Sequence, residues 1–162
     1  CIETVNILRE RGLKIGSTTG YTQEMMDIVT AGAKSQGYSP DYYTTPNAVP
    51  AGRPAPYMIY QNMLTLGEED TDCVIKIGDT ISDIKEGRNA KVWTVGRLKG
   101  SSELGLSLEE VNSLSEKELK EKMEKTAEKI LSAGANFVIE DISKVPYIID
   151  IINNKLKNGE RA

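Results

Sequence analysis

The sequence contains no histidine, and this absence excludes several kinds of active site. A Ser-His-Asp triad and a Cys-His pair both use an imidazole as the base, so neither can be built from this chain. Metal centres with histidine ligands are excluded for the same reason. Any chemistry must therefore come from other side chains.

Cysteine, long apolar runs and excess positive charge are also scarce. Cys1 and Cys73 give no disulfide framework, and Cys73 opens an apolar segment, so we expect a buried thiol in a reducing cytoplasm. No apolar run approaches the roughly 18 residues that span a bilayer, and we expect no membrane partner. The net charge of -4 argues against a nucleic-acid partner. Residues 115–129 alternate Lys with Glu, which is typical of a solvated helix face.

Strand-like and helical segments alternate over the 162 residues, which suit a single domain spanning 1–162. We expect helices over 2–12, 22–37, 55–67, 82–90, 115–133 and 143–156. We expect strands over 13–17, 41–45, 73–78, 91–96 and 136–140, and a Gly/Ser-rich loop over 96–107. Strands separated by helices form βαβ units, so the sequence predicts an α/β fold: a Rossmann-like parallel sheet sandwiched by helices.

Ligands of such a sheet bind beyond the carboxyl ends of its strands, and polar side chains follow three of the expected strands. They are Ser17, Thr18 and Thr19 after the first strand, Arg53 after the second, and Asp79 and Asp83 after the third.

The two aspartates are spaced by one helical turn, so both can face one point. Neighbouring carboxylates repel each other unless a cation lies between or beside them. Mg²⁺ prefers such oxygen ligands, and we therefore expect Mg²⁺ at Asp79 and Asp83. The alternative is that Asp79 caps the following helix while Asp83 lies at the surface.

The hydroxyls and the arginine are suited to an anion. Ser17, Thr18 and Thr19 precede Gly20, so hydroxyls and backbone N–H groups can point at a bound anion near a helix N-terminus. The guanidinium of Arg53 suits bidentate binding of a phosphoryl group. The alternatives are a helix-entry segment for the hydroxyls and a surface charge for Arg53.

Four motifs carry a resemblance to a known family. "GSTTGYT", "PAGRPAP", "GDTISD" and "GSSELGL" occur in this order, and together they resemble the phosphonoacetaldehyde hydrolases of the haloacid dehalogenase superfamily. The resemblance implies a Mg²⁺-dependent hydrolase that cleaves the P–C bond of phosphonoacetaldehyde to give acetaldehyde and phosphate.

The resemblance also implies roles for individual residues. Asp79 would bind Mg²⁺, and Asp83 would hold a metal-bound water or a neighbouring hydroxyl. Arg53 and Thr19 would act in catalysis and bind the phosphonate oxygens. Ser17 and Thr18 would donate further hydrogen bonds, and Tyr21 would shape the loop.

Two elements of that family have no counterpart in the sequence. The family begins with a strand that ends in an aspartate nucleophile, and a helical cap follows with a lysine that forms a Schiff base with the aldehyde. We therefore expect an N-terminally truncated fragment that lacks this central strand and the cap and is inactive alone. The resemblance implies a possible homodimer for the full-length enzyme.

Three alternatives stay open from the residues. A haloacid dehalogenase-type phosphomonoesterase would use the same strand-end clusters. A non-catalytic core fragment could bind Mg²⁺ or phosphate. A receiver domain is disfavoured because it needs an early acidic pair, whereas the early strand here leads into hydroxyls.

Overall fold

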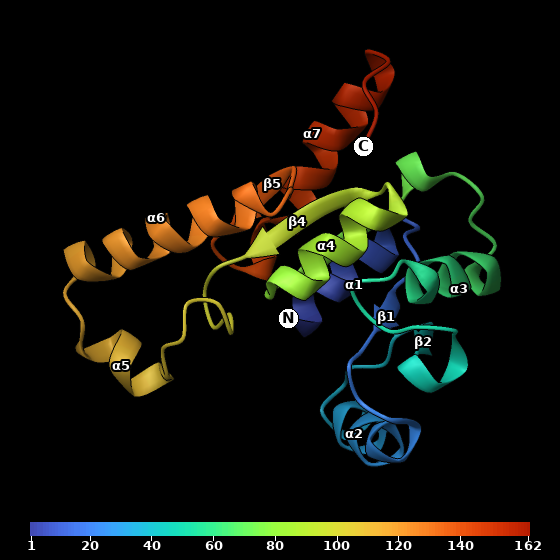
Figure 1. Ribbon diagram of the computed structural model, residues 1–162, viewed down its shortest axis with the longest axis horizontal. Helices are drawn as coiled ribbons and strands as arrows, with labels where there is room; N and C mark the ends of the chain where they lie inside the picture. Colours follow the sequence, from blue (N-terminus) through green and yellow to red (C-terminus); the bar gives the residue numbers. More distant parts are fainter.

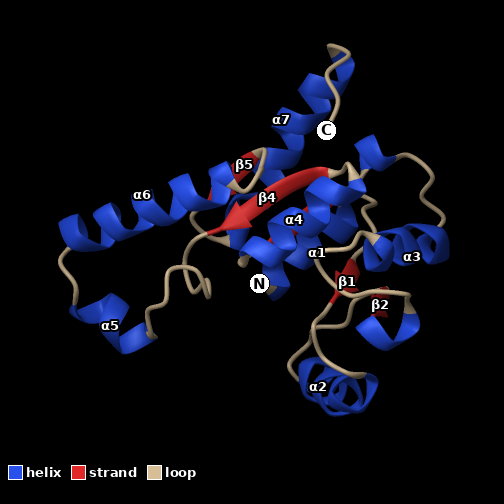
Figure 2. Cartoon of the chain, viewed as in Figure 1, coloured by secondary structure: helices blue, strands red, loops and turns tan.

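The computed structural model describes residues 1–162, apart from the side chain of Leu108. Helices and strands alternate along the chain as predicted (Figure 2). The strands are β1 (Gly16–Thr18), β2 (Tyr42–Thr44), β3 (Ile75–Gly78), β4 (Trp93–Arg97) and β5 (Phe137–Ile139). The α-helices are α1 (Ile2–Glu10), α2 (Gln23–Ser35), α3 (Tyr57–Leu66), α4 (Ile81–Ala90), α5 (Leu108–Ser113), α6 (Glu116–Ser132) and α7 (Val145–Lys157). Short 3₁₀ turns are η1 (Pro46–Ala48), η2 (Thr71–Cys73) and η3 (Ile142–Lys144).

The strands form two parallel sheets, and this division positions the site. In the first, β1 pairs with β2, and Gly16 lies opposite Tyr42. In the second, the order is β3-β4-β5, with Ile75 opposite Trp93. The parallel architecture is confirmed. The sheet is interrupted between β1 and β3, where the sequence predicts a missing central strand; we call this space the sheet gap.

Helices cover both faces of the three-stranded sheet (Figure 1). Strand residues alternate between the faces, so Trp93 and Val95 pack in one apolar cluster with Leu8 of α1 and Ile152 of α7. On the other side, Ile84 of α4 forms a second cluster with residues that include Ile130 of α6. The sheet is therefore buried between two helical layers.

Gly96 allows α6 to approach the sheet closely. A Cβ atom at this position would lie 2.3 Å from Cγ2 of Ile130, a side chain that is fully buried. Only glycine leaves room for this contact between β4 and α6.

One local expectation was wrong, and one helix was not predicted. Cys73 is exposed, because it ends the 3₁₀ turn η2 and lines the sheet gap instead of opening strand β3. The expected loop over 96–107 is followed by an unpredicted helix, α5, whose N-cap Ser107 and residue Glu110 form a capping box. That box is a sequence signal for a helix start, and the prediction overlooked it.

Among the described residues, every helix is too short or too polar to cross a lipid bilayer.

The charged helix was placed correctly: α6 begins after the N-cap Ser115, which forms a capping box with Glu118.

Candidate active site

The loops that follow β1, β2 and β3 meet at one end of the sheet gap. A cavity of about 610 Å³ lies there, and its lining includes Ser17, Thr18, Arg53, Asp79 and Asp83. Five of the six predicted site residues therefore line a common space. Thr19 lies at the neighbouring surface, next to a second hollow that Ser17 and Thr18 also line.

Arg53 bridges two of these loops. One nitrogen of its guanidinium, Nη1, pairs with Oδ1 of Asp83. A Cβ atom at Gly20 would lie 2.9 Å from the other nitrogen, Nη2. The side chain is only 21% exposed, so Arg53 is not a free surface charge. Its loop is tied to α4 by Asn89, whose Nδ2 donates to the carbonyl oxygen of Pro54 at 2.8 Å.

Asp83 is buried and surrounded by hydrogen-bond donors. Besides Arg53, its Oδ1 contacts the Lys76 ammonium at 2.9 Å, and its Oδ2 accepts from the Thr80 hydroxyl at 2.7 Å. Burial alone would raise the pKa of Asp83, but Lys76, Thr80 and Arg53 together lower this pKa to about 2. Asp83 is therefore a permanent anion at neutral pH.

The backbone around Asp83 explains its position. Thr80 is the N-cap of α4, and its hydroxyl accepts from the backbone N–H of Asp83 at 3.1 Å. A Cβ atom at Gly78 would lie 2.2 Å from Cβ of Asp83, so only glycine lets this side chain lie over the strand end. The alternative in which Asp79 caps the helix and Asp83 is exposed is excluded.

Lys76, which the sequence analysis did not select, lies at the centre of a buried network. Its Nζ donates to the Thr18 hydroxyl at 2.7 Å and contacts Oε2 of Glu86 at 2.7 Å, in addition to Asp83. The Thr18 hydroxyl in turn donates to Oε2 of Glu86 at 2.9 Å. The signal was present: a lysine inside the apolar run "VIKIG" must find partners in the interior. We call Lys76, Thr18, Asp83 and Glu86 the Lys76 network.

Asp79 has a more open environment. Its Oδ2 accepts from Arg97 Nη2 at 3.1 Å and from the backbone N–H of Ser102 at 3.3 Å. Its side chain is 30% exposed, against 6% for Asp83. Because of this exposure, Asp79 can still reach a ligand in the cavity. Its partner Arg97, at the end of β4, was not selected by the sequence analysis.

The three hydroxyls after β1 differ in what they contact. The Thr18 hydroxyl belongs to the Lys76 network, so it faces inward. The Thr19 hydroxyl accepts from the backbone N–H of Tyr21 at 3.1 Å and shapes the turn. Ser17 lines both hollows. Helix α2 begins only at Gln23, after its N-cap Thr22, so the hydroxyls are not the entry to a helix.

The carboxylates fit a divalent cation only in part. Both oxygens of Asp83 already accept from Arg53, Lys76 or Thr80. Asp79 has one oxygen, Oδ2, bound to donors, and its other oxygen is its available ligand atom. Among the described residues, no three acidic or cysteine side chains are arranged so that they could hold a metal ion together. A Mg²⁺ ion bound here would find one available carboxylate oxygen, on Asp79, and its other oxygen ligands would come from water, substrate or another segment.

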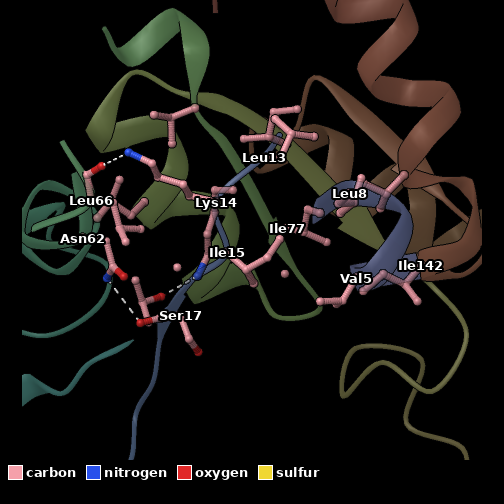
Figure 3. A pocket seen from close by; sticks show the side chains of 18 of the residues that line it. Val5, Leu8, Leu13, Lys14, Ile15, Ser17, Asn62, Leu66, Ile77 and Ile142 are labelled. Atoms are coloured by element: carbon pink, nitrogen blue, oxygen red, sulfur yellow. Dashed lines mark hydrogen bonds between the residues drawn. The ribbon is translucent and has the colours of Figure 1, made fainter. Parts of the chain in front are cut away.

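The sheet gap extends from this site into the apolar interior (Figure 3). Ile15 and Ile77 lie in the middle of the view, between Leu66 on one side and Val5 on the other. Residues on both sides of the gap, from β1 and from β3, line the same cavity. The gap is therefore bounded by β1, by β3 and by apolar side chains.

Residues 1–91 match the haloacid dehalogenase-like hydrolases, and the chain belongs to this family. Two curated relatives named phosphonoacetaldehyde hydrolase confirm the resemblance. The relative from Parabacteroides distasonis is 54% identical over 95% of this chain and 58% of its own length. The relative from Bacteroides fragilis is 51% identical over 97% of this chain and 60% of its own length. The chain therefore spans about three-fifths of the length of these relatives.

Solved structures agree with this family. A phosphonoacetaldehyde hydrolase-like protein from Oleispira antarctica superimposes with a TM-score of 0.95 at 33% identity, over 99% of this chain and 58% of that chain. A haloacid dehalogenase family hydrolase from Deinococcus radiodurans, with bound phosphate and sodium, gives a TM-score of 0.70 at 15% identity, over 94% of this chain and 58% of that chain. The second likeness shows the fold alone.

Proposed function

We propose that this chain forms the phosphoryl-binding part of an enzyme that hydrolyses phosphonoacetaldehyde to acetaldehyde and phosphate. The position of Arg53 carries this proposal: its guanidinium lies between Gly20 and Asp83, at the end of the sheet gap. The names of the relatives from Parabacteroides distasonis and Bacteroides fragilis supply the substrate.

Arg53 would bind the phosphonate group through donors that Asp83 leaves available. A guanidinium has five N–H donors, and Asp83 engages only the Nη1 end. Because Asp83 fixes this cation before the reaction, Arg53 can stabilise charge that develops on the phosphoryl oxygens without reorganising. Ser17 and Thr19, at the neighbouring strand end, would donate to the same oxygens.

Mg²⁺, when bound, would offset the negative charge of the phosphonate as a Lewis acid. Asp79 would hold it through the oxygen that Arg97 and Ser102 do not use. Asp83 would keep the Thr80 hydroxyl and the Arg53 guanidinium in place beside it.

The sheet gap suggests where the nucleophile would come from. A strand inserted parallel to β1 and β3 would bury the apolar lining of the gap and satisfy both strand edges. Its carboxyl end would then lie beside Arg53 and Asp79. An aspartate there would attack phosphorus, and the electron pair of the broken C–P bond would pass to an iminium that a cap lysine forms with the aldehyde.

The test is an assay of the full-length product of the gene that encodes this chain. We expect turnover of phosphonoacetaldehyde that requires Mg²⁺, and borohydride trapping of a lysine-linked adduct. Turnover of sugar phosphates without trapping would instead indicate a phosphomonoesterase.

The 162-residue polypeptide by itself provides a second test. We expect it not to cleave phosphonoacetaldehyde, because the proposed nucleophile and Schiff-base lysine have no counterpart among its residues. Turnover by the purified polypeptide, confirmed by intact mass, would contradict the proposal.

A further inference from the structure

Lys76 lies in the middle of β3 and is among the residues that line the cavity. Its side chain is 9% exposed, and its ammonium contacts one acceptor on each of three residues: Thr18, Asp83 and Glu86. The contact with Thr18 is a hydrogen bond, and the contacts with Asp83 and Glu86 are ion pairs. The Lys76 ammonium is therefore held by protein groups from three residues.

The three partners come from different elements of the fold. Thr18 is on β1, on the far side of the sheet gap, whereas Asp83 and Glu86 are on successive turns of α4. Lys76 thus connects the end of the two-stranded sheet to the helix that carries Asp83. A displacement of its ammonium would change the position of β1 relative to α4.

The position of Lys76 affects Arg53 through Asp83. The same oxygen, Oδ1, contacts both the Lys76 ammonium and the Arg53 guanidinium. Without Lys76, the Asp83 carboxylate would lose one of the two cations that hold it and could rotate toward Arg53. The guanidinium would then turn away from the place where it meets a phosphoryl group.

Glu86 explains how a second cation can be buried beside Arg53. Its side chain is fully buried, and its Oε2 accepts from Lys76 and Thr18. Two cations and two carboxylates make this cluster neutral before any substrate binds. Glu86 therefore offsets the charge of Lys76 and leaves Asp83 available to orient Arg53.

We propose that Lys76, which is paired with Glu86, is a positioning residue. It fixes Asp83 and, through Asp83, the phosphoryl-binding guanidinium of Arg53. This inference deepens the proposed function and rests on it. Lys76 acts through Asp83 and does not touch the substrate.

The test uses the full-length protein with Lys76→Met combined with Glu86→Gln, which removes both charges together and leaves no unpaired buried ion between them. The control is Lys85→Met, the same substitution at an exposed position of α4. Three quantities are measured for each protein: the dissociation constant of inorganic phosphate, kcat/KM for phosphonoacetaldehyde, and the urea midpoint of unfolding.

We expect the double variant to bind phosphate at least tenfold more weakly and to lose at least thirtyfold in kcat/KM, with a urea midpoint close to that of the wild type. The control should stay within threefold of the wild type in both functional quantities. A merely structural role would lower the urea midpoint and leave the phosphate affinity of the folded protein unchanged. Phosphate affinity within tenfold of the wild type would overturn the inference.

Two further outcomes also test the inference. If the double variant does not fold, Lys76→Arg replaces it. A planar guanidinium cannot reproduce three contacts around one nitrogen, so phosphate should bind at least fivefold more weakly to this variant. A smaller change in phosphate affinity overturns the inference. If the wild type binds phosphate but does not cleave phosphonoacetaldehyde, the proposed substrate is wrong while phosphate affinity still decides the role of Lys76. A wild type that binds no phosphate would overturn both.

Discussion

The two sheets of this protein are stabilised in different ways. The three-stranded sheet is covered on both faces by helices, and its apolar clusters contain fully buried residues such as Ile84 and Ile130. The two-stranded sheet packs against α3, whereas α2 lies beyond its strands (Figure 1) and buries Met26 alone. On α2, Ile28 is 78% exposed. The site lies where these differently packed parts meet.

This difference shows why the junction is polar. Apolar packing also joins the two parts, because Ile59 and Met63 of α3 cluster with Ala90 and Val92. At the strand ends, directional contacts are added: Lys76 binds Thr18 across the gap, and Arg53 reaches from the loop after β2 to Asp83. Residues that bind charge therefore also align the two sheets.

The largest effect should come from breaking the charge balance at the junction. Lys76→Met alone leaves the buried carboxylates of Glu86 and Asp83 without their shared cation, which should destabilise the full-length protein by about 3–5 kcal/mol. Urea unfolding measures this loss. Adding Glu86→Gln should restore much of the stability, and a double variant as unstable as the single one would show that the charge balance is not the cause.

Gly96→Ala tests the tightly packed sheet. The added methyl group would meet Ile130 at 2.3 Å, and Ile130 is fully buried. We expect a loss of about 2–3 kcal/mol in the free energy of unfolding, the usual cost of overpacking a core. Thermal unfolding monitored by circular dichroism is sufficient to detect it. A loss below about 0.5 kcal/mol would mean that α6 can shift away from β4 at little cost.

Glu103 provides a smaller, pH-dependent test in the same part of the molecule. Its side chain pairs with Lys129 of α6 and accepts from the backbone N–H of Ile81 at 3.1 Å, and these contacts lower its pKa. A lowered pKa in the folded state contributes stability above the pKa of the unfolded chain, and this stability is lost as the pH falls. Glu103→Gln should therefore cost about 1 kcal/mol at pH 7 and little at pH 3. A cost that does not change between these pH values would contradict this explanation.

The sequence analysis predicted the parallel fold and the convergence of Arg53 with Asp83, because strand ends and family motifs mark these features locally. It did not identify Lys76, Glu86 or Arg97, which become site residues only through partners distant in sequence. Lys76 meets Thr18 across 58 residues, and no spacing rule connects such a pair. Cys73 was misplaced because its burial depends on what fills the sheet gap, and burial across a gap cannot be read from one segment.

The smallest expected effect has the opposite sign and comes from the two-stranded part. Gly32 lies inside α2, and a Cβ atom there would meet nothing within 4 Å. Gly32→Ala should therefore stabilise the protein by about 0.5–1 kcal/mol, because alanine loses less backbone entropy than glycine on entering a helix. It is the same substitution as Gly96→Ala, so thermal unfolding of the two variants compares the two parts of the molecule directly. If Gly32→Ala were destabilising, another segment of the full-length protein would have to cover the open face of α2. The difference in packing between the two sheets would then not hold in the full-length protein.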